Sequence, residues 1–148
     1  MSKGFTLLEL LIVMGIIAII SVLAISSLGR FRKNSALDSA HQDTLTALHE
    51  ARELTLSSKE ATTYGVHFQT DKAVRFTGAI YNADATSNVP YIFDSRVRIV
   101  EINLGGGSDV IFRRLTGEAG ATGNVVVAVY GQDTHRATTT ISLSGIIQ

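Results

Sequence analysis

One apolar run near the start of the chain limits what this sequence can fold into. It covers residues 10–25 and is interrupted only by one Gly and one Ser. With its flanks it makes about 36 Å of helix at 1.5 Å per residue. A hydrocarbon core is about 30 Å thick, so we predict a transmembrane helix over residues 5–29.

A cleaved secretory signal is the alternative explanation for this run. Such a signal has a shorter apolar core, which is followed by an A-x-A-like cleavage site. Here residues 26–33 read SSLGRFRK, a sequence that is typical of the exit from a membrane. We therefore predict that the helix is retained.

Glu9 does not suit an ordinary anchor, because an ionised carboxylate costs about 2.5–3.5 kcal/mol at the bilayer centre. In an isolated anchor, a position shallow enough to reach the headgroups would account for it. The functional alternative is that Glu9 meets a positive charge inside an assembly of helices.

The residues before the apolar run favour the functional alternative. Residues 1–4 (MSKG) are a short basic leader, and residues 4–10 read GFTLLEL. This segment resembles the class III signal of type IV pilins and type II secretion pseudopilins. The resemblance implies that prepilin peptidase cuts between Gly4 and Phe5 and methylates the new amine of Phe5. Glu9 then becomes the fifth mature residue, where the family keeps its glutamate.

The predicted cut has an electrostatic consequence. It creates an ammonium group at Phe5, close to the carboxylate of Glu9. A buried charge must be paired, so we predict that Glu9 of one subunit pairs with the Phe5 amine of its neighbour. This pairing would fix the axial register of the packed helices.

The orientation in the membrane is also taken from the resemblance. Three basic residues within 30–33 outnumber Lys3, so counting positive charges favours the opposite orientation. The leader must nevertheless reach a cytoplasm-facing peptidase. We expect a single-pass protein of the bacterial inner membrane, with its globular domain periplasmic. Many pilins have a proline at the position of Ser26, and its absence leaves open whether the helix breaks near 26–29.

The helical pattern continues beyond the membrane segment. A stripe of apolar and small residues recurs at helical spacing and predicts an amphipathic helix over residues 30–57. The stripe consists of Leu37, Ala40, Thr44, Leu45, Leu48, Ala51, Leu54 and Thr55. We therefore expect one long helix from about Thr6 to about Ser57, whose second half packs against the rest of the chain.

Residues 58–148 have the pattern of a β-rich globular domain. We predict strands over 63–68, 73–77, 97–104, 109–115, 125–130 and 138–143, and a loop over 81–93. A glycine-rich turn at 105–108 would join two of these strands into a hairpin, and the strand at 125–130 is apolar enough for burial on both faces. The predicted fold class is α+β, with two small antiparallel sheets packed on the helix.

This layout resembles the H-type minor pseudopilins of type II secretion and their FimT-like pilin relatives. The resembling features are residues 51–52 (AR), a strand at 110–112 (VIF) and a terminal strand at 141–146 (ISLSGI). The resemblance implies a low-copy, non-catalytic subunit that helps to initiate or cap a pseudopilus or pilus. Its implied partners are prepilin peptidase, other pilins bound through the N-terminal helix, the membrane and the inner-membrane assembly platform. Because Glu9 is retained, we expect a position below the extreme tip.

Other chemistries find little support. The chain has no Cys, which excludes a disulfide framework, Cys-ligated zinc and thiol catalysis. The four His residues lack metal-ligand spacing, and the glycines at 105–107 precede a strand rather than the helix that a phosphate cradle needs. We expect no enzyme activity, cofactor, metal or small-molecule substrate. A membrane-tethered enzyme or adhesin that borrows the export route is a further hypothesis.

DNA uptake, which some FimT-like pilins perform, is the alternative function. The candidate contacts are Arg96, Arg98, Arg113 and Arg114. Residues 58–148 contain eight Lys or Arg and eight Asp or Glu, so their net formal charge is zero. A DNA-binding domain usually has a basic excess, and we therefore do not expect a nucleic-acid partner.

Overall fold

The computed structural model describes residues 4–57 and 59–148, apart from the side chains of residues 23–27 and 59. The chain divides into two compact units, Met1–Asn34 and Ser35–Gln148. Most of the predicted leader (residues 1–3) and the first residue of the predicted β domain (Ser58) lie outside the described residues.

The first element is the helix α1, Leu7–Leu56. Its bounds lie within one residue of the predicted ones, and it continues without interruption through residues 26–29. The short 3₁₀ helix η1, Lys59–Ala61, follows it. Glu60 and Ala61 have φ values of 56° and 52°, so the chain leaves α1 through a left-handed turn.

The stripe predicted along residues 37–55 is the buried face of the helix within the second unit. All but two of its members are buried, and Leu45 and Leu54 are half-buried. The hydroxyls of Thr44 and Thr55 are satisfied within the helix, because they donate to the carbonyls four residues earlier, at 2.9 and 2.8 Å. The amphipathic prediction is therefore confirmed for residues 37–55.

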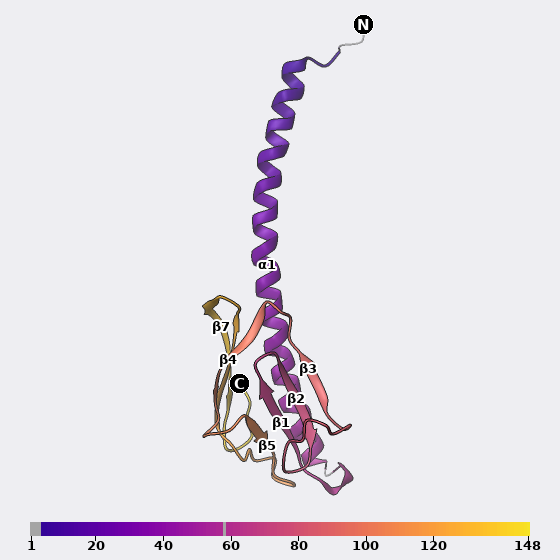
Figure 1. The fold of residues 1–148 in the computed structure, drawn as a ribbon, viewed down its shortest axis with the longest axis vertical. Helices are drawn as coiled ribbons and strands as arrows, with labels where there is room; N and C mark the ends of the chain where they lie inside the picture. The colour runs from indigo at the N-terminus through magenta and orange to yellow at the C-terminus, as the bar shows by residue number, and fades with distance from the viewer. Residues whose placement is uncertain (1–3, 58) are drawn as a thin grey trace. The chain divides into compact units, whose positions relative to one another are not determined.

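Two antiparallel sheets complete the second unit, and they confirm the predicted α+β class (Figure 1). The first sheet has the order β3-β2-β1-β5, with β3 Val89–Ile92, β2 Lys72–Thr77, β1 Tyr64–Gln69 and β5 Asp109–Ile111. The second has the order β4-β6-β7, with β4 Val97–Asn103, β6 Gly123–Val129 and β7 Gln132–Ile141.

The hairpin predicted around the glycine-rich turn at 105–108 is wrong. β4 pairs with β6, whereas β5 pairs with β1, so the turn connects two different sheets. Side chains on both sides of the turn explain this result, because Leu104 and Val110 are both buried in the core. The amide of Phe68 also donates to the Ser108 carbonyl at 2.8 Å, which ties the end of the turn to β1.

Strand β3 lies inside the segment predicted to be a loop, at residues 81–93. It contains Pro90, which suggested a loop because proline cannot donate to a sheet ladder. β3 is an edge strand, so the missing donor faces away from its only neighbour, β2. β5 is shorter than predicted, and β7 begins six residues earlier, through an exposed polar segment.

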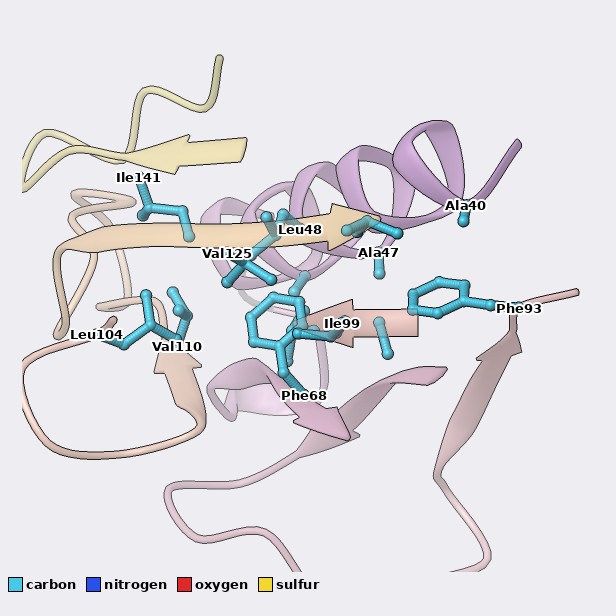
Figure 2. Close-up of a cluster of buried hydrophobic side chains, with 14 of the residues drawn as sticks. Ala40, Ala47, Leu48, Phe68, Phe93, Ile99, Leu104, Val110, Val125 and Ile141 are labelled. Atoms are coloured by element: carbon cyan, nitrogen blue, oxygen red, sulfur yellow. The ribbon is translucent and has the colours of Figure 1, made fainter. Parts of the chain in front are cut away.

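The core of the second unit lies between the helix and the two sheets. Figure 2 shows Leu48 from α1, Phe68 from β1 and Ile99 from β4 in one cluster with Val125 from β6. Residues 125–129 of β6 are all buried, which confirms the prediction of a strand covered on both faces.

Candidate functional site

The N-terminal segment combines a capped helix start with an exposed extended segment. The Glu9 amide donates to the Thr6 hydroxyl oxygen at 3.2 Å, which is the N-cap bond of the T-x-x-E pattern at residues 6–9. Gly4 and Phe5 precede this cap and are not helical. The bond between them is therefore presented on accessible, non-helical chain, as a peptidase requires.

Glu9 lies in the first turn of α1, where a negative charge is favourable at the positive end of the helix dipole. Its amide is occupied by Thr6, but its side chain is exposed. Among the described residues, no cation pairs with its carboxylate.

The surface of the first unit is strongly apolar. Large hydrophobic side chains are exposed along residues 5–22, and Phe5 is 78% exposed. The Ser21 hydroxyl, one of the few polar groups here, donates to the Ile17 carbonyl at 2.7 Å. Contiguous apolar surfaces of this kind mark sites of association with protein or lipid. In the described part of the chain, no helix has both the length and the apolar character needed to span a membrane.

The four arginines proposed as nucleic-acid contacts do not share one sheet. Arg96 and Arg98 lie before and on β4, whereas Arg113 and Arg114 follow β5. Three of them face carboxylates: Arg96 pairs with Asp94 at 2.7 Å, Arg113 with Glu118 at 3.4 Å, and Arg98 with Asp133 at 3.6 Å. Pairing lowers the charge that these side chains offer to phosphate.

The Asp94–Arg96 pair gives a pH-dependent prediction. Arg96 donates to both carboxylate oxygens, and its amide also donates to one of them, which lowers the pKa of Asp94 from 3.8 to about 2. Because the pKa of Asp94 is lower in the folded chain, the ion pair stabilises the fold when the pH is above the ordinary pKa of 3.8. This contribution is lost as the pH falls towards 2. We expect the carboxyl ¹³C resonance of Asp94 to titrate with a midpoint near 2. Arg96→Gln should return the midpoint towards 3.8; an unchanged midpoint would contradict the assignment.

Sequence reasoning missed two polar clusters. The Tyr91 hydroxyl donates to Glu50 at 2.5 Å, and Arg75 faces the same carboxylate at 3.2 Å, so β3 and β2 are joined to α1. Burial, together with the hydrogen bond to Glu50, raises the pKa of Tyr91. These residues are far apart in the sequence, so no local pattern could reveal them.

The second missed cluster lies at β1, on the face of the first sheet opposite to Arg75. His67 contacts Asp109 at 2.5 Å and stacks on Tyr81, with ring centroids 3.9 Å apart. Asp109 is therefore paired with a histidine. In the part of the chain that the structure describes, no group of three or more His, Asp or Glu side chains is placed to hold a metal ion.

Comparison with known proteins adds one finding. The prokaryotic N-terminal methylation motif matches residues 1–25. This motif is the type IV pilin-like prepilin signal, and it indicates a precursor that is processed by prepilin peptidase. The match includes Gly4, Phe5 and Glu9. No curated protein and no solved structure matches the chain.

Proposed function

We propose that this protein is a non-catalytic minor pseudopilin or pilin subunit, which assembles into a type II secretion pseudopilus or a type IV pilus. The observation that carries the proposal is the methylation motif over residues 1–25. The motif accounts for the exposed, non-helical segment at Gly4 and Phe5 and for the apolar helix that follows it. The assignment to the H-type and FimT-like subunits is part of the proposal and is supported by two antiparallel sheets packed on the helix.

Assembly through the N-terminal helix follows from the exposed side chains. A helix whose apolar residues face outward must be covered by lipid or by other helices. In the proposed life cycle, lipid of the inner membrane covers residues 5–29 before assembly, and neighbouring subunits cover them in the fibre. The second unit, residues 35–148, remains extracytoplasmic throughout.

The proposed register contact joins Glu9 to the Phe5 amine of a neighbouring subunit. Glu9 has an exposed carboxylate that no described cation neutralises, and cleavage supplies the missing cation. Once two apolar helices pack side by side, an unpaired carboxylate in the contact would be costly. The pair therefore selects one axial offset between the helices.

The processing step can be tested by mass spectrometry. We expect the full chain, co-expressed with prepilin peptidase, to begin at Phe5 and to carry one methyl group on its amine. Gly4→Val should leave the chain intact, because a branched side chain would stand next to the scissile bond. Gly15→Ala is the matched control, since no atom beyond the neighbouring residues and the local helix backbone lies within 4 Å of the added carbon, and it should be processed normally. An unprocessed wild-type chain would refute the proposal.

A further inference from the structure

The loop after β5 presents an apolar side chain at a strained position. Leu115 has a φ of 70° and is 77% exposed. A left-handed backbone is unfavourable for a residue that carries a Cβ, and burial does not compensate for it here. Strained residues of this kind are often found at functional surfaces. The surroundings of Leu115 are therefore a candidate interaction surface.

Three segments of the second unit meet beside this loop. The Arg52 side chain donates to the Gly117 carbonyl at 3.2 Å, and the Ala119 amide donates to the Leu143 carbonyl at 3.1 Å. The end of α1, the loop and the C-terminal segment are thereby held together. Their exposed apolar residues form what we call the Leu115 surface: Leu56, Leu115, Leu143 and Ile146.

A free positive charge accompanies the Leu115 surface. Arg114 is exposed, and among the described residues it has no ion pair or hydrogen bond through its side chain, whereas its neighbour Arg113 faces Glu118. A partner for this surface would therefore combine apolar contact with a carboxylate that reaches Arg114.

The same unit contains a cavity whose lining has both an apolar side chain and carboxylates, which are complementary to Leu115 and Arg114. Its volume is about 560 Å³, which leaves room for side chains of another chain. Its lining includes Leu54, three carboxylates and one cation: Glu50, Glu53, Glu60 and Arg75. Glu50 is paired with Arg75, but no cation pairs with Glu53 or Glu60 among the side chains that the structure describes. We call this feature the acidic cavity.

The Leu115 surface and the acidic cavity lie on different sides of the helix end. Arg52 and Leu56, four residues apart, face the loop, whereas Glu53 and Ser57 line the cavity. At 3.6 residues per turn these two pairs point in different directions, so the two features are placed to meet between copies rather than within one.

We propose that the loop carrying Arg114 and Leu115 of one copy enters the acidic cavity of the next copy. The apolar side chains pack against Leu54, and Arg114 pairs with Glu53 or Glu60. The contact is heterologous, because each copy contributes a different surface, so it can join even the few copies of a low-copy subunit head to tail. It involves only the second unit and does not depend on cleavage after Gly4.

Disulfide trapping of the full chain in detergent tests this contact, because the chain has no Cys of its own. Thr116→Cys places a thiol beside Leu115, and Ser87→Cys places one in the cavity lining. After oxidation, the double variant should form dimers, trimers and longer species. The control pairs Thr116→Cys with Thr138→Cys, an exposed position on β7, and should remain largely monomeric. A ladder no stronger than that of the control would overturn the proposal and indicate another occupant, such as a different protein or lipid.

Charge reversal in the same background tests the proposed ion pair. Arg114→Glu and Glu53→Arg should each lower the cross-linked fraction about fivefold, because each places like charges together. Combining them in one chain should restore the ladder. Arg136→Glu, an equal charge change on exposed β7, should have no effect. No loss in the single variants, or no recovery in the combined one, would also overturn the proposal.

Discussion

Glu9→Val should reduce incorporation into the fibre by more than about 100-fold while leaving cleavage after Gly4 unchanged. In the proposed packing, the substitution leaves the Phe5 ammonium of the neighbour without a partner in apolar surroundings. Breaking a buried pair in this way costs about 3–5 kcal/mol, and each 1.4 kcal/mol is about a factor of ten. The Thr6 cap uses the amide of residue 9, so it is retained in the variant.

The measurement is the amount of the subunit in sheared fibres relative to the membrane fraction. Glu101→Val is the matched control, because Glu101 is exposed on β4 of the second unit. It should assemble as the wild type does. Wild-type incorporation of Glu9→Val would show that the register argument is wrong, even if processing at Phe5 occurs as proposed.

Gly123→Ala should destabilise the second unit by more than about 3 kcal/mol. Gly123 has a φ of +147°, and a Cβ at this position would lie 1.7 Å from the carbonyl oxygen of Asn103. The obstacle is backbone of the paired strand β4, so the ladder between β4 and β6 must separate locally. Thermal unfolding followed by circular dichroism should show a Tm lower by about 10 °C or more.

Gly107→Ala provides the control for this prediction. The nearest atom to an added Cβ is the Asp109 amide nitrogen at 3.9 Å, and the backbone of Gly107 is not left-handed. Its free energy of unfolding should change by no more than about 0.5 kcal/mol. Equal effects of the two substitutions would show that the close approach at Gly123 is not the cause.

The features that the sequence predicted well are those that depend on local periodicity. The long helix was predictable because its stripe from Leu37 to Thr55 repeats with helical spacing and no proline interrupts it. The strand at 125–129 was predictable because every residue in it is small or apolar. The prepilin signal was recognisable because Gly4, Phe5 and Glu9 stand at fixed offsets in one short motif, and residues 1–25 match the N-terminal methylation motif. The roles of these three residues remain predictions.

The features that were missed depend on contacts between distant residues. Pairing of β5 with β1 requires Val110 to lie opposite Val66, and the glycine-rich turn before it carries no signal of that choice. Tyr91 meets Glu50 across 41 residues of sequence. Arg98 was considered as a nucleic-acid contact, but its carboxylate partner, Asp133, lies on β7, far away in the sequence.

The Thr6 cap, which begins α1, lies after the predicted cleavage site between Gly4 and Phe5. No hydrogen bond among the described residues joins Gly4 to the helix, so removal of Gly4 breaks none of the described bonds at the start of α1. In the proposed mature chain, the ammonium at Phe5 would stand beside the positive end of the helix dipole, an unfavourable place for a cation. Cleavage would thus leave the helix intact but electrostatically unbalanced at its tip. A carboxylate from the adjoining subunit would relieve this imbalance, so that peptidase action itself makes the chain ready to assemble.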